Sequence, residues 1–500
     1  MKRWGITISL LVIVLVFGLN AYSEFPKMGK GKIGISLKSK LKDTGSRFSA
    51  LVIMKEQADL SGAENIDDVQ EKRRYVYDQT RNTALKAQVD IVQWLNEQNV
   101  KFRRFHIANM LALYDVSPAL IEKIAERKDV EKIVSNPSVK LDLPTLSLGD
   151  NSRNVLDAIG QNIISTGASK VWTEFNNRGR GIVVAGQDTG IQWNHPALIK
   201  QYRGYQETGV VHDYNWHDAV HADVGNGSNR CGYDTAAPCD DNAHGTHTVG
   251  TIVGDEGSVN TIGMAPDAKW IGCRNMDAGV GTPATYIECF EFFLAPYPQN
   301  GNPMMDGDTS KTPDVINNSW GCPQDEGCEG SEMLFVVKAL SAAGVMVVVS
   351  AGNDGPGCAT IKDQPAHLSG DVLSVGAIDY RTGEIANFSS RGPSAFTGLI
   401  GPDLTAPGVT IRSAVPGSKY AQYGWSGTSM AGPHVAGAVA LLWSIRPELY
   451  GKIKETAEIL TKTADPKTAS QTCGSVPGSS IPNNTFGFGI LNIYNAVSNR

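Results

Sequence analysis

The sequence has no cysteine before Cys231, no excess of basic residues and no second long apolar run beyond its first 20 residues. Charged residues make up 19% of 500 positions, and the formal net charge is −6, so the clustered basic face that nucleic-acid binding requires is missing. The 53 glycines and 24 prolines follow no three-residue period, which excludes collagen and indicates many tight turns. With 41% hydrophobic residues, the chain is expected to be globular rather than disordered or a multi-span membrane protein.

A signal peptide is predicted over residues 1–23. Lys2 and Arg3 form a positive start, residues 6–17 are almost wholly apolar, and residues 21–23 offer the small side chains that a signal peptidase needs. The apolar run is shorter than the roughly 20 residues of a spanning helix. Cleavage after Ser23, with no membrane span afterwards, is therefore favoured over an uncleaved anchor, and we expect an extracellular or periplasmic protein.

All eight cysteines follow residue 230, and an exported chain meets an oxidising compartment, so disulfides are favoured over free thiols. Eight cysteines allow 105 connectivities, and the sequence does not choose among them. Short loops favour two pairs, and the remaining four cysteines could form two more: Cys231–Cys239 and Cys322–Cys328, then Cys273–Cys289 and Cys358–Cys473. Metal binding is the alternative, but no zinc-type cysteine spacing occurs.

Residues 24–150 are predicted to form a separate segment whose core, about 47–141, is a small α+β unit. Its expected elements are a strand at 50–54, a helix at about 67–98, strand-like stretches within 102–116, a short helix at 118–127 and a strand at 130–134. This βαββαβ order is the ferredoxin-like pattern. Residues 24–150 carry 21 basic against 18 acidic residues, and residues 151–500 carry 22 against 33. The asymmetry is read either as chance or as electrostatic docking of the two parts.

From about residue 159 to 497, strands alternate with helices. Short apolar runs of the kind buried on both faces of a parallel sheet occur at 181–185, 270–272, 315–317 and 345–349, and a helix is predicted at 334–343. The pattern predicts an α/β fold with a doubly wound, mostly parallel sheet over residues 151–500. Its functional residues should gather at the carboxyl ends of the strands.

Three sequence blocks place reactive side chains at such positions. Asp188 follows the first strand in DTG at 188–190, and His244 opens a predicted helix in HGTHTVGT at 244–251, where Gly245 allows close approach to the imidazole. Ser429 begins the helix of GTSMAGPHVAG at 427–437, whose unpaired N–H groups favour an oxyanion. Asp188 alone is more readily a turn residue and Ser429 alone a helix N-cap, whereas the His244 block is moderately specific. Together, in this order, they match one known arrangement of a nucleophilic triad.

These blocks closely resemble the subtilisin-like serine proteases, or subtilases, and lean toward the bacillopeptidase F-like branch. Further landmarks of the family are GMAPDAK at 263–269, NSWG at 318–321, SAGN at 350–353, NFSSRGP at 387–393 and TAPG at 405–408. The match covers roughly residues 160–497, and the earlier βαββαβ unit resembles the inhibitory propeptide of the I9 type. Together the motifs are highly specific, whereas any one alone is not.

The resemblance implies a role for each matched residue. Ser429 would be the nucleophile, His244 the general base, Asp188 the residue that orients the imidazole, and Asn353 an oxyanion donor. The stretches 319–321 and 351–352 would bind an extended peptide, through Ser319, Trp320, Gly321, Ala351 and Gly352. Trp320 is read equally as a pocket wall or as a core residue.

No cofactor is expected for catalysis, and Ca²⁺ is a possible structural ion. Acidic loops at 240–241 and 306–308 could hold it, although solvated turns are favoured. His247 and His434 are read as packing residues. The long insertion at about 202–239 carries His212, His217 and His221, for which a solvated loop is favoured over a metal site.

The sequence therefore predicts a secreted, monomeric serine endopeptidase that acts on protein and peptide substrates and is inhibited by its own propeptide. One alternative is a binding protein with the subtilase fold and an inactive site. The other is a Ser-Glu-Asp enzyme of the sedolisin type, which is disfavoured because a histidine block stands where that type needs a glutamate.

Overall fold

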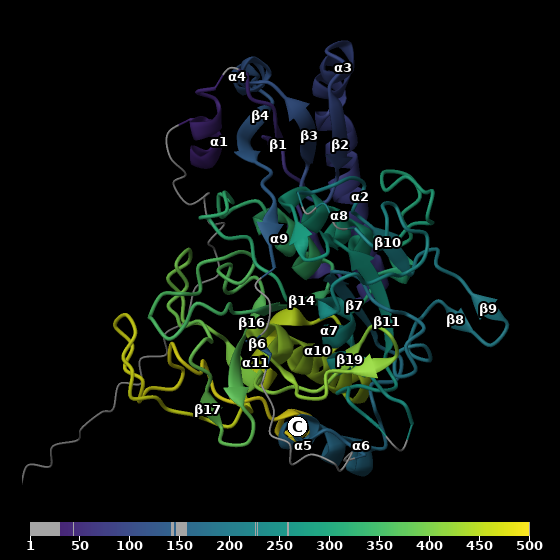
Figure 1. Ribbon diagram of the computed structural model, residues 1–500, viewed down its shortest axis with the longest axis vertical. Coiled ribbons are helices and arrows are strands. Elements are labelled where there is room, and N and C mark those ends of the chain that lie inside the picture. Colours follow the sequence, from purple (N-terminus) through teal and green to yellow (C-terminus); the bar gives the residue numbers. More distant parts are fainter. Residues whose placement is uncertain are drawn as a thin grey trace, which may run out of the picture. The chain divides into compact units, whose positions relative to one another are not determined.

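The computed structural model describes residues 31–43, 45–141, 145–146, 158–225, 227, 229–257 and 260–499 (Figure 1). The predicted signal peptide and the predicted junction near residue 150 lie outside these residues. Below, residues 32–141 are called the N-terminal region and residues 158–499 the C-terminal region. Both belong to one compact unit.

The N-terminal region contains a four-stranded antiparallel sheet in the order β2-β3-β1-β4. Its elements are β1 (Phe48–Met54), α2 (Val69–Ala87), α3 (Val89–Glu97), β2 (Lys101–Phe105), β3 (Met110–Val116), α4 (Pro118–Glu126) and β4 (Val130–Ser135). Alternate residues of β1 face opposite sides, because side chains alternate along a strand. Val52 packs with α3 and α4, whereas Ile53 joins α8 (Pro283–Leu294) and α9 (Leu334–Ala342) of the C-terminal region in one core. The predicted α+β unit is confirmed.

The helix expected over 67–98 is two helices, because it is interrupted at Gln88. This side chain is fully buried, and its amide nitrogen donates to the carbonyl of Phe105 at 3.0 Å and to Oδ1 of Asn109 at 2.8 Å. Arg104 donates to the amide oxygen of Gln88 at 2.8 Å. The break thus coincides with a polar anchor for the turn between β2 and β3, which helix periodicity does not reveal.

The C-terminal region is built on an eight-stranded sheet in the order β10-β11-β7-β14-β15-β16-β17, with β18 also paired to β16. The strands are β7 (Val183–Asp188), β10 (Trp216–Asp218), β11 (Lys269–Arg274), β14 (Val315–Asn318), β15 (Met346–Ser350), β16 (Leu373–Asp379), β17 (Glu384–Ile385) and β18 (Leu404–Pro407). All pairings are parallel except that of β17 with β16. This confirms the predicted fold class, and all four apolar runs are strands of this sheet.

Helices cover both faces of this sheet (Figure 1). On one side α8 (Pro283–Leu294) and α9 (Leu334–Ala342) share a core with Val347 of β15. On the other side α7 (His244–Val253) and α10 (Thr428–Ile445) share a core with Val348, the next residue. A strand buried on both faces needs apolar residues at consecutive positions, which explains the unbroken apolar run of β15.

Shorter elements complete the fold. They are α1 (Ile35–Lys40), η1 (Ser61–Asn65), β5 (Val139–Lys140), β6 (Thr145–Leu146), α5 (Gln161–Ser165), α6 (Ala168–Phe175), β8 (Tyr205–Gln206), β9 (Gly209–Val210), β12 (Met276–Asp277), β13 (Val280–Gly281), η2 (Thr309–Lys311), β19 (Ala414–Val415), β20 (Lys419–Tyr420), β21 (Trp425–Ser426), η3 (Pro447–Leu449), α11 (Ile453–Lys462) and α12 (Ile493–Ser498). Among the described residues, no helix is both long and apolar enough to cross a bilayer.

The insertion at 202–239 is not the solvated loop that the sequence favoured. Part of it forms β10, which adds to the edge of the large sheet beside β11 and is buried along its whole length. His217 is the middle residue of β10. Its burial follows from sheet pairing, which three residues flanked by polar sequence do not predict.

Four disulfides include the two pairs that the sequence favoured, Cys231–Cys239 and Cys322–Cys328, and the two further pairs that it allowed, Cys273–Cys289 and Cys358–Cys473. Three close short loops, with sequence separations of 6 to 16 residues. The fourth spans 115 residues and ties the segment after α11 to the loop after β15. It therefore restricts the unfolded chain most.

Replacing Cys358 and Cys473 together by serine should lower the free energy of unfolding by about 4–5 kcal/mol in the chain-entropy account. The same change at Cys231 and Cys239, whose disulfide spans a sequence separation of 8 residues, should cost only about 2–3 kcal/mol. Guanidinium denaturation of both variants measures the difference. Equal losses would contradict a contribution that grows with loop length.

Candidate active site

Asp188 and His244 form a buried hydrogen-bonded pair. Asp188 is the last residue of β7, and His244 is the first residue of α7. The imidazole Nδ1 lies 2.8 Å from Oδ1 and 2.9 Å from Oδ2 of Asp188. Oδ1 also accepts the backbone N–H of Thr189 at 2.7 Å. The carboxylate therefore fixes the ring with Nδ1 toward Asp188 and Nε2 away from it.

Two glycines allow this strand end and this helix start to touch. A Cβ on Gly245 would lie 2.2 Å from the carbonyl oxygen of Gly190 and 2.9 Å from Cβ of Asp188. A Cβ on Gly190 would lie 1.8 Å from the carbonyl oxygen of Cys239, and its φ is +105°. Glycine is thus required at 245 for the contact itself and at 190 for the turn after β7 to pass the loop before α7. The sequence had pointed to Gly245 for this reason.

Asp240 holds the turn that leads into α7. Its carboxylate accepts the backbone N–H of Asn242, Ala243 and Thr246 at 2.8–3.0 Å, and also the hydroxyls of Thr189 and Thr246. Its neighbour Asp241 pairs with Arg274 at 2.7 Å, and both side chains are buried. The solvated turn favoured for 240–241 is therefore wrong. These carboxylates anchor the helix start through protein donors.

Ser429 is the second residue of α10 and is buried. Its Oγ donates to the carbonyl of Ser319 at 3.1 Å, and Oγ of Ser319 donates to the carbonyl of Ser429 at 3.1 Å. Nε2 of His244 is buried and has no hydrogen-bond partner among the described residues. The structure therefore joins Asp188 to His244, whereas no hydrogen bond links His244 to Ser429. Such bonds are often long in free enzymes and tighten when substrate binds.

Asn353 lies beside the start of α10. Its Oδ1 accepts the backbone N–H and the hydroxyl of Thr428, both at 2.9 Å. The N–H of Gly352, whose φ is +103°, donates to the same hydroxyl at 3.3 Å. These bonds satisfy one of the unpaired N–H groups of the helix start and set the orientation of the Asn353 amide next to Ser429.

Trp320 is a core residue. It is 5% exposed, its ring stacks on Tyr286 with centroids 3.9 Å apart, and its Nε1 donates to the carbonyl of Gln187 at 3.2 Å. Of the two interpretations left open by the sequence, these contacts favour packing. Its neighbour Ser319 is the residue of this stretch that touches Ser429.

The other residues predicted to bind substrate lie at strand ends near α10. Ala351 is buried and donates its N–H to the carbonyl of Val375 at 3.0 Å, directly after β15. Gly321 lies two residues beyond Ser319, and a Cβ there would lie 3.3 Å from Asp363. The carboxyl ends of β7, β14 and β15 thus carry the predicted residues.

An extended strand-binding edge was missed by the sequence. The strand β5 of the N-terminal region pairs antiparallel with β13, with Val139 opposite Gly281 and Lys140 opposite Val280. Farther along the chain, β6 pairs antiparallel with β21, just before α10. Two-residue strands give no hydrophobic period, so only the turn glycine at 279, with φ of +93°, hints at this edge.

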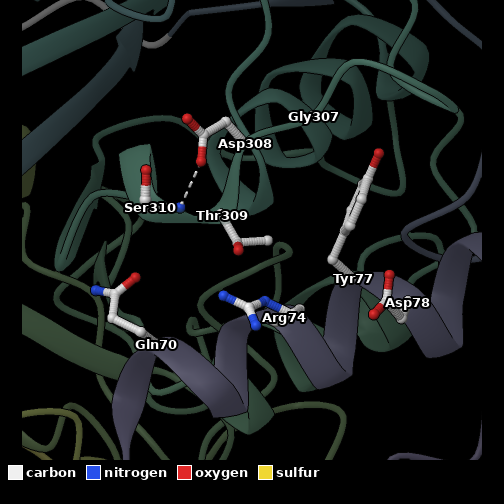
Figure 2. A pocket seen from close by; sticks show the side chains of 8 residues that line it. All are labelled: Gln70, Arg74, Tyr77, Asp78, Gly307, Asp308, Thr309 and Ser310. Carbon is white, nitrogen blue, oxygen red and sulfur yellow. Dashed lines mark hydrogen bonds between the residues drawn. The ribbon is translucent and has the colours of Figure 1, made fainter.

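A cavity of about 560 Å³ lies elsewhere, between α2 and the segment 307–310. Figure 2 shows Arg74 and Tyr77 of α2 on one side and Asp308 and Ser310 on the other. None of the predicted catalytic or substrate-binding residues lines it, although Asp308 of the candidate Ca²⁺ loop does. Asp306 and Asp308 accept nearby backbone N–H groups at 2.7 and 2.9 Å, as in ordinary turns.

His247 and His434 pack as the sequence indicated. His247 stacks on Trp425 with centroids 4.6 Å apart and bonds through Nε2 to the carbonyl of Ile411. His434 bonds to the carbonyl of Met430 and to the amide of Asn162. Burial lowers the pKa of His247 to about 3 and that of His434 to about 4, so both rings are neutral.

Known proteins are similar to this chain in sequence. Residues 179–489 match the model of the subtilase family. Bacillopeptidase F of Bacillus subtilis (strain 168) is 36% identical over 449 residues, which cover 86% of this chain but only 29% of that protein. Serine protease AprX and subtilisin E of the same strain are 29% and 34% identical, over 72% and 53% of this chain and 75% and 64% of theirs. Because the family match covers more than half of the residues and contains the Asp188, His244 and Ser429 blocks, this chain belongs to the subtilase family of serine proteases.

Proposed function

We propose that the chain is a secreted endopeptidase that cleaves peptide bonds through Asp188, His244 and Ser429 and is made as a propeptide-inhibited precursor. The observation that carries this proposal is the buried bond between Asp188 and Nδ1 of His244, which leaves Nε2 as the available base. A base without a bonded partner is the group that an adjacent hydroxyl nucleophile requires.

In the proposed reaction, Oγ of Ser429 attacks the carbonyl carbon of the scissile bond while Nε2 of His244 takes its proton. Asp188 stabilises the imidazolium and stays ionised. The tetrahedral intermediate collapses, the C–N bond breaks, and His244 gives the proton to the leaving amine. Water, activated by the same imidazole, then hydrolyses the ester on Ser429 and returns the enzyme to its starting state.

The oxyanion of each intermediate would be stabilised at the start of α10. The backbone N–H of Ser429 belongs to the first turn of this helix, where N–H groups lack partners within the helix. The amide of Asn353 would be the second donor, since its Oδ1 is held by Thr428 beside that turn. Loss of one such donor lowers kcat by about 10²–10³, a magnitude known from subtilisin.

The substrate would bind as an added strand. The backbone edge at Val280 and Gly281 accepts β5 in antiparallel register, and an extended peptide can use the same main-chain groups. Such main-chain pairing depends little on the side chains of the substrate. Broad acceptance of protein and peptide sequences is therefore expected.

The N-terminal region would act as the inhibitor. Besides pairing with β13 through β5, it makes buried polar contacts with the C-terminal region. Nη2 of Arg73 lies 2.8 Å from Oδ1 of Asp314, with both side chains under 5% exposed. The N–H groups of His106 and Ile107 donate to Glu291 at 2.5 and 3.1 Å. These contacts favour the docking interpretation of the charge asymmetry over chance.

Export to an oxidising compartment is supported by the four disulfides. The apolar start of the sequence would direct it there. A monomer that needs no cofactor for catalysis is the proposed form, with Ca²⁺ as an optional structural ion.

The nucleophile is tested with a serine-directed fluorophosphonate. The purified protein is incubated until its mass is constant and is then labelled and digested for peptide mapping. Label is expected on Ser429, because only a hydroxyl with a neighbouring base reacts rapidly. It should disappear in His244→Ala, whose kcat should fall by about 10⁶, the loss known for the equivalent change in subtilisin.

The matched control Ser418→Ala changes an exposed serine and should keep full labelling. An unlabelled but folded wild-type protein would favour the binding-protein alternative.

Gly245→Ala tests the contact between β7 and α7. The new Cβ would lie 2.2 Å from the Gly190 oxygen, so α7 must shift and carry His244 with it. Misplacement of a reacting group by about 1 Å costs roughly 10²-fold in rate. Hydrolysis of a peptide p-nitroanilide measures kcat. The control Gly357→Ala, where the nearest atom would be 3.6 Å away, should be unaffected. Similar kcat values for the two variants would refute the constraint.

Arg73→Ala tests docking of the N-terminal region. The experiment uses a chain with Ser429→Ala, which cannot cut itself. Removing one partner of a buried ion pair costs about 3–5 kcal/mol, so amides of α2 should exchange hydrogen at least about 100-fold faster. Arg47→Ala is the control, because its pair with Asp115 is exposed and should contribute under about 1 kcal/mol. Unchanged exchange in Arg73→Ala would show that this pair does not hold the two regions together.

A further inference from the structure

Two imidazoles and a carboxylate converge on the side of the large sheet that α8 covers. His217 lies in β10, His221 follows it by four residues, and Glu288 lies in α8. Oε1 of Glu288 lies 2.6 Å from Nε2 of His217 and 2.8 Å from Nε2 of His221. The three ligand atoms lie within 4.8 Å of one another. None of these residues belongs to the proposed catalytic machinery.

A cation already occupies this cluster. The guanidinium of Arg103, from β2 of the N-terminal region, places Nη2 2.5 Å from Oε1 of Glu288 and Nη1 2.8 Å from Nε2 of His221. The Tyr297 hydroxyl lies 3.3 Å from Nε2 of His217. Arg103 thus binds through the same atoms that would ligate a metal ion, so the two cations exclude each other.

The surroundings also suit a metal ligand set. Nδ1 of His221 contacts the carboxylate of Asp234, which directs Nε2 toward the cluster. A carboxylate behind a ligating histidine fixes the ring and raises its basicity. His217 is held by stacking on Phe292, with centroids 5.2 Å apart. Both rings are therefore oriented before any metal arrives.

The buried carboxylate needs a positive partner. Oε1 of Glu288 lies 2.5 Å from Nη2 of Arg103, 2.6 Å from Nε2 of His217 and 2.8 Å from Nε2 of His221. Glu288 is 2% exposed. An ionised carboxylate at this depth is costly when its cation leaves. Removal of Arg103 would thus leave two imidazoles and an anion facing a vacant position.

We propose that His217, His221 and Glu288 form a binding site for a divalent transition metal of the Zn²⁺ class, which Arg103 closes while the N-terminal region is docked. Two nitrogen ligands and one oxygen suit Zn²⁺ rather than Ca²⁺ or Mg²⁺, which prefer oxygen. Ligand atoms at about 2.1 Å from a tetrahedral Zn²⁺ lie roughly 3.4 Å apart. The two distances from Oε1 of Glu288 to the imidazole nitrogens, 2.6 and 2.8 Å, must lengthen by less than about 1 Å to reach that geometry, and water would complete it.

The test uses the full chain with Ser429→Ala, so that metal binding is measured without proteolysis and its outcome does not depend on the proposed activity. Arg103→Ala is added to vacate the cluster. Titration with Co²⁺, followed by its visible absorption, and with Zn²⁺, followed by calorimetry, gives affinity and stoichiometry. We expect one ion per chain, bound about 100-fold or more tightly than by the chain that keeps Arg103.

Control variants assign the binding to this cluster. With Arg103→Ala in place, His217→Ala or Glu288→Gln should abolish the tight binding, and Asp234→Asn should weaken it about 10-fold through His221. Arg47→Ala, in place of Arg103→Ala, should leave the affinity at the level of the Ser429→Ala chain, because it removes an exposed arginine elsewhere in the N-terminal region.

Arg103→Gln is measured in parallel, since it removes the charge but keeps most of the side-chain volume. Near-UV circular dichroism shows which variants are folded. The proposal is overturned if every folded Arg103 variant binds Zn²⁺ no more tightly than the chain with Arg103, or if tight binding survives His217→Ala.

Discussion

The hydrogen bond between Asp188 and His244 sets the strictest geometric constraint in this protein. It requires the last residue of a sheet strand and the first residue of a helix to meet without any side chain between them, which explains glycine at 245, while glycine at 190 lets the turn after β7 pass the carbonyl of Cys239. It also requires a rigid turn before α7, and the fully satisfied carboxylate of Asp240 supplies it. The neighbouring strands then carry Ser319 and Asn353 to the same edge, where α10 begins.

The sequence predicted the parts of the fold whose physical signals are local. Runs such as that of β15 are apolar at consecutive positions because both faces of the sheet are covered, and such an unbroken apolar run can be read from the sequence alone. Asp188, His244 and Ser429 were found because strand ends and helix starts bear recognisable motifs. The structure adds their placement: two of the three are hydrogen-bonded to each other, and Ser429 bonds to Ser319 instead.

The features that the sequence missed all depend on distant partners. The edge at Val280 and Gly281 is a strand only because β5 pairs with it. The helix break at Gln88 reflects an amide buried against the β2–β3 turn. Asp241 was expected in solvent, but its partner Arg274 lies 33 residues away. No window of adjacent residues contains such information, because burial of a polar side chain is decided by the group that meets it.

The ion pairs Arg73–Asp314 and Arg103–Glu288 both join the two regions but are not equivalent, and the difference explains why only the second suggests another cation. Asp314 keeps neutral donors when Arg73 is absent, since Tyr450 donates to Oδ1 at 2.5 Å and the N–H of Val183 donates to Oδ2 at 2.8 Å. Glu288 is surrounded instead by imidazoles and by Arg103. An N–H or O–H group offers a carboxylate only a hydrogen bond, whereas a deprotonated imidazole nitrogen can also offer a lone pair to a metal ion. In the proposed site, the cation at the centre of the Glu288 cluster is therefore Arg103 while the N-terminal region is docked and a metal ion once Arg103 has left.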